Sequence, residues 1–235
     1  MKNGDFIKMD FVGRLVATGE IFDSTSEEQA KKDGVHDPKQ KYGPILIIIG
    51  ASMTVPGVEK HLMEMRVGEE REFDVKPSEA FGQRSPELMR VLPINKFIKE
   101  KINPVPGMFV TIDHRQAKIQ SVSGGRIRVD FNHPLASREL HYKIKITELI
   151  ENPLEKAKTI ADYFAIKCEA ELKEDALTIK TEKKAPAIVE KLLGDWIKKY
   201  ITDIKSIAFV SKEGSKTKPT EKKEISTGKN PDTKP

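Results

Sequence analysis

The chain has 235 residues and a formal net charge of +5, from 41 basic against 36 acidic side chains. Hydrophobic residues make up 37% and charged residues 33%, which is too polar for one compact globule and indicates several small domains or partial disorder. A single cysteine excludes an intramolecular disulfide framework and any multi-cysteine metal site. The longest apolar run, Ile45–Ile49, is too short to span a bilayer, and the N-terminus lacks a signal-peptide core. We therefore expect a cytoplasmic protein.

Residues 1–84 have the pattern of short strands around one helix. Phe6–Val16 is rich in β-forming residues, and Ile45–Ile49 is an apolar run typical of a buried strand. Residues 24–44 between them are polar and contain Gly and Pro, so we expect a long loop. A helix is predicted to start at Pro56. Its apolar face is formed at positions i, i+4 and i+7 by Val58, Leu62 and Met65.

Residues 85–131 differ in character from the segment before them. The stretch from Leu88 to Ile102 is densely apolar and is followed by a Pro- and Gly-containing break at 104–107. Three strand-like pieces come next, with Ser123-Gly124-Gly125 as a hairpin turn; they are Met108–Asp113, Lys118–Ser121 and Arg126–Phe131. This pattern predicts a small, mostly-β unit. Leu140–Ile146 then alternates apolar and polar residues, as a half-buried strand does.

The last third changes pattern again. Asn152-Pro153 is a helix start, and a second amphipathic helix is predicted over Pro186–Ile201. Strand-like segments at 170–172, 176–179 and 204–210 complete an α-β-β-α-β order, which predicts a separate α+β domain. The second helix carries apolar residues at successive i+4 steps, which are either the core of this domain or, where exposed, a dimer interface; they are Ile188, Leu192, Trp196 and Tyr200. Residues 212–235 are polar and basic, and we expect them to be disordered.

The sequence offers no group suited to covalent or cofactor chemistry. It contains no phosphate-binding glycine loop, no dinucleotide fingerprint and no His-Glu-x-x-His motif. The five histidines are scattered without metal-ligand spacing, and Cys168 follows a predicted amphipathic helix, where a structural thiol is the default. We predict neither a cofactor nor a metal ion.

Seven short motifs nevertheless occur in a recognisable order. They are Phe11-Val12-Gly13, Gly19-Glu20-Ile21-Phe22-Asp23-Ser24, the 50–57 segment leading into the 58–65 helix, Val67-Gly68-Glu69, Glu79-Ala80-Phe81-Gly82, Asp130-Phe131-Asn132-His133-Pro134-Leu135-Ala136, and the strand from Leu140 to Leu149. Over residues 1–152 the chain resembles the FKBP-type peptidyl-prolyl cis-trans isomerases. The segment Asn132-His133-Pro134-Leu135-Ala136, which follows an insertion of residues 85–131, resembles the SlyD-like branch with its insert-in-flap chaperone domain. With its C-terminal extension the chain is most similar to the long archaeal FKBP isomerase/chaperones.

The resemblance implies an α+β fold, an antiparallel sheet curled around a short helix. The isomerase domain would comprise residues 1–84 and 132–152, and the mostly-β insert would comprise residues 85–131. Residues 153–211 would form the separate α+β domain, with a possible role in dimerisation. The implied pocket, between sheet and helix, would be lined by Phe11, Phe22, Asp23, Ile45, Ile47, Thr54, Val55, Val58, Phe81 and Tyr142. Val58 replaces the tryptophan of small single-domain members and Phe81 replaces a tyrosine, so we expect isomerase activity with weak or no macrolide binding.

The insert is expected to hold unfolded or partly folded polypeptides that contain X-Pro bonds. A domain of this size has a poor surface-to-volume ratio, so some of its apolar residues should be exposed. We assign client binding to Leu88, Met89, Leu92, Ile94, Phe97, Ile98 and Met108. The alternative is a catalytically weak or inactive holdase chaperone, or a ribosome-associated binding module, and a peptide isomerisation assay separates the two.

The positive charge is concentrated in two segments. Residues 85–131 hold eight basic and four acidic side chains, and residues 212–235 hold seven and four, whereas residues 1–84 hold 12 and 15. This distribution favours capture of flexible, acidic polypeptides over nucleic-acid binding, for which a continuous basic face would be expected.

Overall fold

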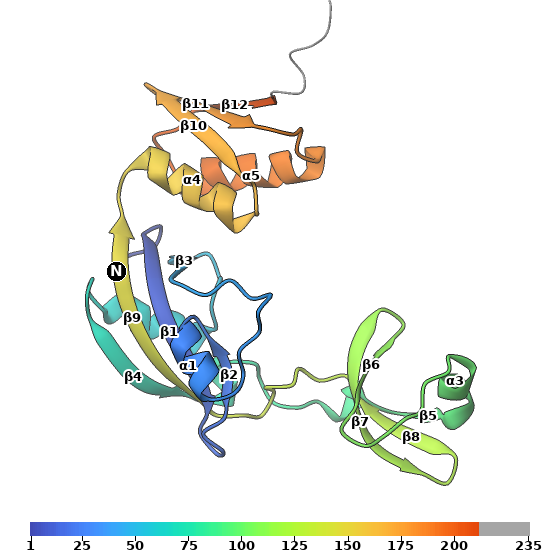
Figure 1. Cartoon of the computed structure of the whole chain (residues 1–235). Helices are drawn as coiled ribbons and strands as arrows, with labels where there is room; N and C mark the ends of the chain where they lie inside the picture. The colour runs from blue at the N-terminus through green and yellow to red at the C-terminus, as the bar shows by residue number, and fades with distance from the viewer. Residues whose placement is uncertain (212–235) are drawn as a thin grey trace, which may run out of the picture. The chain divides into compact units, whose positions relative to one another are not determined.

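The computed structural model describes residues 1–211, so the predicted disordered tail at 212–235 lies outside the described residues. The chain divides into two compact units, Met1–Glu151 and the residues from Asn152 onward (Figure 1). Among the residues described, no helix is both long and apolar enough to cross a membrane.

The first unit is built on an antiparallel sheet with few helices, which is an α+β arrangement. Its strands follow the order β2-β1-β9-β4, and β3 also pairs with β1. The strands are β1 (Phe6–Leu15), β2 (Ile21–Ser24), β3 (Ile45–Ile48), β4 (Glu70–Val75) and β9 (Leu140–Ile150). The central pair, β1 with β9, runs from Phe6 opposite Ile150 to Leu15 opposite Leu140. It therefore joins the two ends of the unit.

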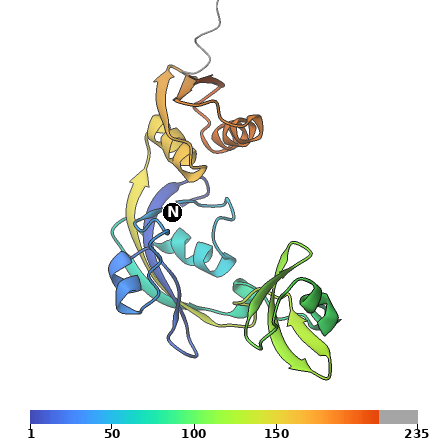
Figure 2. The same cartoon turned by 45° about the vertical axis from the view of Figure 1, so that its right-hand side comes forward.

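Helix α2 (Pro56–Glu64) packs against the concave side of this sheet (Figure 2). Pro56 occupies the first turn, where its missing N–H costs nothing. Val58 and Leu62 are buried among sheet residues such as Ile144, as the predicted apolar face requires. A Cβ on Gly57 would lie 2.4 Å from Cγ1 of Val75, so glycine allows the helix to approach β4 closely. Two 3-10 turns follow, η1 (Pro77–Glu79) and η2 (Pro86–Leu88).

The polar segment 24–44 was predicted to be a loop, and this is wrong in one place because it contains helix α1 (Glu27–Lys32). The Oγ of Ser26 accepts a hydrogen bond from the Gln29 amide and caps the helix. Glutamates stand in its first turn and lysines in its last, which suits the helix dipole. Only Ala30 is buried, so the sequence has no apolar periodicity here, and the capping pattern was the available signal.

The segment between β4 and β9 forms a second sheet of its own, with strand order β5-β8-β7-β6. Its elements are β5 (Met89–Pro93), α3 (Ile94–Lys99), β6 (Phe109–Ile112), β7 (Arg115–Ser123) and β8 (Arg126–Asp130). One face of this sheet is covered by α3, whose Phe97 is only 3% exposed and packs with Ile127 and Val129. The assignment of Phe97 to client binding is therefore wrong, because this side chain is buried in the core of the small sheet.

The second unit has the element order α-β-β-α-β. Its elements are α4 (Pro153–Tyr163), β10 (Cys168–Lys173), β11 (Ala176–Thr181), α5 (Ala187–Tyr200) and β12 (Ser206–Ser211). Asn152 caps α4 by accepting hydrogen bonds from the amides of Leu154 and Glu155. Strands β10 and β11 are antiparallel, whereas β11 and β12 are parallel. A parallel pair needs a crossover connection, and α5 supplies it.

The apolar residues of α5 that were predicted to be either the core of this unit or an exposed dimer interface are not the most buried residues of the helix. Leu193 and Ile197 are fully buried, while Ile188 is 65% exposed and Leu192 43% exposed. The buried residues Leu193, Ile197 and Ile201 form an i+4 stripe of their own. It is displaced by one residue from the predicted stripe, which is about 100° around a 3.6-residue helix. Ile188 and Leu192 of the predicted stripe therefore face outward, whereas Tyr200 is half-buried. Trp196 is half-buried and is surrounded by the rings of Tyr163, Phe164 and Tyr200.

Candidate active site

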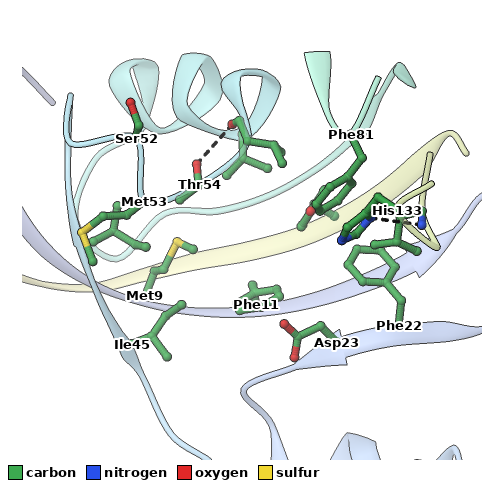
Figure 3. A pocket seen from close by; sticks show the side chains of 15 residues that line it. Met9, Phe11, Phe22, Asp23, Ile45, Ser52, Met53, Thr54, Phe81 and His133 are labelled. Atoms are coloured by element: carbon green, nitrogen blue, oxygen red, sulfur yellow. Dashed lines mark hydrogen bonds between the residues drawn. The ribbon is translucent and has the colours of Figure 1, made fainter. Parts of the chain in front are cut away.

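A cavity of about 560 Å³ opens between the concave side of the first sheet and the segment that leads into α2 (Figure 3). Its size is that of a pocket for a small ligand. The structure brings all ten residues of the predicted pocket together in its lining, namely Phe11, Phe22, Asp23, Ile45, Ile47, Thr54, Val55, Val58, Phe81 and Tyr142. They come from β1, β2, β3, α2, β9 and the loops after β3 and η1.

Tyr142 on β9 forms the centre of the aromatic wall. The Phe22 ring meets it edge-on with a centroid separation of 5.7 Å, and the Phe11 ring lies 6.2 Å away. Gly13 lies opposite Tyr142 in the β1–β9 register, and a Cβ on it would lie 2.4 Å from Cζ of Phe22. Glycine at this position therefore leaves the space in which Phe22 lies against the wall.

The floor of the cavity is formed by buried apolar residues, and the polar groups lie around it. Val58 is 2% exposed and Ile47 3% exposed. The Asp23 side chain is exposed at the wall, and its Oδ1 accepts a hydrogen bond from the Ser24 amide. Burial, and then the negative charge of Asp23, raise the pKa of Tyr142 to about 12. The phenol therefore stays protonated at neutral pH and is a hydrogen-bond donor.

Five further residues line the cavity that the sequence prediction missed: Met9, Ser52, Met53, His133 and Leu135. The His133 ring stacks on the Phe81 ring (Figure 3). Their centroids are 4.1 Å apart and their planes differ by 2°. The His133 Nδ1 accepts a hydrogen bond from the Leu135 amide at 3.2 Å, which fixes the ring's orientation. The Asn132-to-Ala136 motif had been recognised, but neither burial nor periodicity marks a loop histidine as part of a pocket.

The two segments that connect the second sheet to the pocket are tied to each other. The Asn132 Oδ1 accepts from the Ser85 amide at 2.8 Å, and its Nδ2 donates to the Ser85 carbonyl at 3.0 Å. Arg84 forms an ion pair with the buried carboxylate of Asp130 at 2.6 Å. Burial acts to raise the pKa of Asp130, but the hydrogen bonds from the Asn132 main chain and side chain, together with the Arg84 charge, outweigh it and hold the pKa below its usual value.

The apolar residues predicted to bind clients are distributed unevenly on the second sheet and its helix. Leu88, Met89, Leu92 and Ile94 are half-buried, whereas Ile98 and Met108 are exposed. Three further apolar side chains that were not assigned to client binding are also exposed, and they are Val91, Val105 and Phe109. Over residues 1–211, no group of three or more His, Cys, Asp or Glu side chains gathers closely enough to hold a metal ion.

Comparison with known proteins gives the class of this chain. A family model described as FKBP-type peptidyl-prolyl cis-trans isomerase matches residues 1–98, and one described as FKBP26, IF domain, matches residues 90–135. The short-type peptidyl-prolyl cis-trans isomerase of Methanocaldococcus jannaschii is 32% identical over 149 residues, which cover 63% of this chain and 94% of that protein. The chain therefore belongs to the FKBP-type peptidyl-prolyl cis-trans isomerases.

Two bacterial relatives agree with this membership. The FKBP-type 16 kDa peptidyl-prolyl cis-trans isomerase of Escherichia coli is 29% identical over 137 residues, 56% of this chain and 86% of the relative. The FKBP-type peptidyl-prolyl cis-trans isomerase SlyD of Helicobacter pylori is 34% identical over 124 residues, 51% of this chain and 65% of the relative. The second relative is consistent with the SlyD-like branch inferred from the motifs.

The Gly13–Phe22 contact leads to a testable prediction. In Gly13→Ala the added methyl group collides with the Phe22 ring, and overpacking of this kind costs about 1–3 kcal/mol of stability. We expect a lower urea midpoint and slower isomerisation of a short X-Pro peptide, because Phe22 is pushed from the wall. Gly194→Ala in α5 is the matched control, since its Cβ would come no closer than 3.9 Å to Phe209. Equal effects of both substitutions would contradict the assigned role of Gly13.

Proposed function

We propose that the cavity is the site at which this enzyme rotates X-Pro peptide bonds, and that the second sheet with α3 holds the client chain. We call residues 85–131 the insert. The observation that carries the proposal is the convergence of all ten predicted pocket residues on one cavity with a buried apolar floor. The family relationship supports the reaction, and the geometry supports the place.

Rotation about an X-Pro bond needs no nucleophile. The barrier of about 18–20 kcal/mol comes from amide resonance, which is lost when the bond is twisted. The planar amide is more charge-separated than the twisted one, so a site that excludes water disfavours the planar form relative to the twisted form. Val58 and Ile47 exclude water at the floor, and the rings of Phe22 and Tyr142 hold the proline ring beside them.

The polar groups orient the substrate in this proposal. The protonated Tyr142 phenol is a donor within the lining, and the Asp23 carboxylate shapes the local field next to it. The Thr54 hydroxyl already donates to the Val55 carbonyl, so it is an acceptor for the substrate. Val58 and Phe81 offer no side-chain hydrogen bond to a ligand carbonyl, which is why we propose weak or no macrolide binding.

Substitution of the wall tests the site. We expect Phe81→Ala and Asp23→Ala to lower kcat/KM for a short X-Pro peptide, measured in a protease-free assay. A tenfold loss corresponds to about 1.4 kcal/mol of transition-state stabilisation. Val210→Ala and Asp203→Ala are the controls, since both residues are exposed and neither lines the cavity. Unchanged rates in the two folded wall variants would remove this cavity as the active site and favour a holdase without catalysis.

The exposed apolar side chains of the insert support its role as a client-binding module. Val91 is 58% exposed and Phe109 54% exposed. Ile98, Val105 and Met108 of the insert are exposed as well. Such exposure is costly for a small unit unless a partner covers it, and it suits unfolded segments of varied sequence. A client held there would present its prolines to the cavity at a raised effective concentration.

Removal of the insert separates the two activities. Because Ser85 and Asn132 are hydrogen-bonded to each other, a short glycine linker in place of residues 86–130 can close the gap. We expect this variant to keep its rate on a short peptide, where tethering contributes nothing. It should lose most of its acceleration of a proline-limited protein refolding reaction. Full refolding activity without the insert would contradict the client-binding role.

We further propose that two copies of the chain pair through the outer surface of α4 and α5. Ile188, Leu192 and Tyr163 are exposed there, beside the half-buried Trp196. Pairing would bury this apolar surface and bring two isomerase units to one client in the cytoplasm, where we expect the protein to act.

The pairing is tested on the full chain by sedimentation equilibrium. Ile188→Asp with Leu192→Asp places charges on the proposed interface and should convert a dimer into a monomer. Both positions are exposed, so the variant should remain folded by circular dichroism. Lys191→Ala on the same helix is the control and should sediment as the unsubstituted protein does. A monomeric unsubstituted chain at high concentration would end the dimer proposal.

A further inference from the structure

We infer that one face of the insert sheet selects acidic segments that carry apolar residues, a preference that rests on the proposed client binding. We call this surface the outer face, because α3 and the small core cover the opposite side of the sheet. It consists of three cations and three apolar side chains, Lys118, Arg126, Arg128, Met89, Val91 and Phe109.

The strand register places these six residues together. Residues opposite one another in neighbouring strands share a face of a sheet, and the faces alternate along each strand. Val91 is opposite Arg128, Pro93 opposite Arg126, and Phe109 opposite Lys118. The core residues Ile127 and Val129 alternate with these arginines on β8 and point to the other side. The six side chains therefore belong to one continuous surface.

The positive charge of the outer face is not neutralised within the part of the chain that is described. None of the three cations forms an ion pair there, whereas Lys96 near α3 pairs with Asp113. The carboxylate on this face, Asp130, is opposite Lys118 and Met89. It is already bound by Arg84, Asn132 and Gln120 and is almost fully buried. An incoming carboxylate would therefore meet three cations whose charges remain available.

The apolar residues of the outer face indicate a polypeptide partner. The Lys118 ammonium lies 5.5 Å from the centre of the Phe109 ring, and Val91 stands beside Arg128 across the β5–β8 pair. Apolar side chains of a client can thus pack between cations that pair with its carboxylates. Single-stranded nucleic acid would need several stacking rings. The nearby Phe131 ring packs against the core and lies between Arg90 and Arg115, so it is not a second stacking ring on the outer face.

Two unfolded, proline-free peptides test this preference by calorimetric titration into the full-length protein. The peptides have equal length and identical apolar residues, but one carries glutamates where the other carries lysines, and neither occupies the prolyl cavity. We expect the acidic peptide to bind about tenfold more tightly at ~0.02 M salt, because several cations act together. The difference should shrink at ~0.3 M salt, where screening acts within a few ångströms.

Two pairs of variants locate the effect. Arg126→Gln with Arg128→Gln should reduce the acidic preference to about twofold, since the surface ion pairs are lost. Lys99→Gln with Lys101→Gln removes the same charge from the α3 side, which covers the inner face, and should leave the preference unchanged. Phe109→Ala should weaken both peptides equally.

The possible outcomes distinguish failure of the acidic preference from failure of the proposed client binding. Equal binding of the two peptides overturns the acidic preference but leaves client binding intact. Absence of binding by either peptide overturns client binding itself. Stronger binding of a single-stranded oligonucleotide of the same charge than of the acidic peptide, lost in Arg126→Gln with Arg128→Gln, would make the outer face a nucleic-acid site and overturn the inference.

Discussion

The antiparallel pairing of β1 with β9 is the interaction on which the isomerase part of this chain depends. Strands β2 and β3 attach to β1, and β4 attaches to β9, so neither half of the sheet has a place without this pair. The pair also supplies the centre of the cavity wall, because Phe11 comes from one strand and Tyr142 from the other. The register that sets Gly13 opposite Tyr142 leaves the space for Phe22. One set of backbone hydrogen bonds thus positions residues far apart in the sequence.

Much of the cavity was predictable because its residues lie in recognisable motifs with strong local preferences. Pro56-Gly57 marks a helix start, and Val58 and Leu62 fall on one face of that helix as the 3.6-residue period requires. The places of Phe22 and Phe81 in the cavity were predictable because each lies within a short recognisable motif. The spacing of apolar residues could not predict that His133 lies against Phe81. His133 reaches the Phe81 ring only because the two segments flanking the insert are hydrogen-bonded side by side.

Where the sequence misled, tertiary packing decided against a local pattern. Two apolar stripes with the same i+4 spacing lie on α5, and the one that is buried contains Leu193 and Ile197 rather than Ile188 and Leu192. Phe97 looked like one exposed apolar residue among many, but a four-stranded sheet needs a large side chain to cover its inner face. Helix α1 has almost no buried residue and is held by its cap and its charges. Hydrophobic periodicity alone detects none of these three features.

The long separation between the paired strands also sets an order of events during synthesis. Strand β1 leaves the ribosome early, but its partner β9 ends at Ile150, so the central sheet stays open until that residue has been made. The insert closes on itself between Met89 and Asp130, a pairing that spans far less of the chain than that of Phe6 with Ile150. Contacts close in sequence form sooner than distant ones, and chains are made at about 5–20 residues per second. The part proposed to hold clients can thus be complete before the proposed active-site cavity exists.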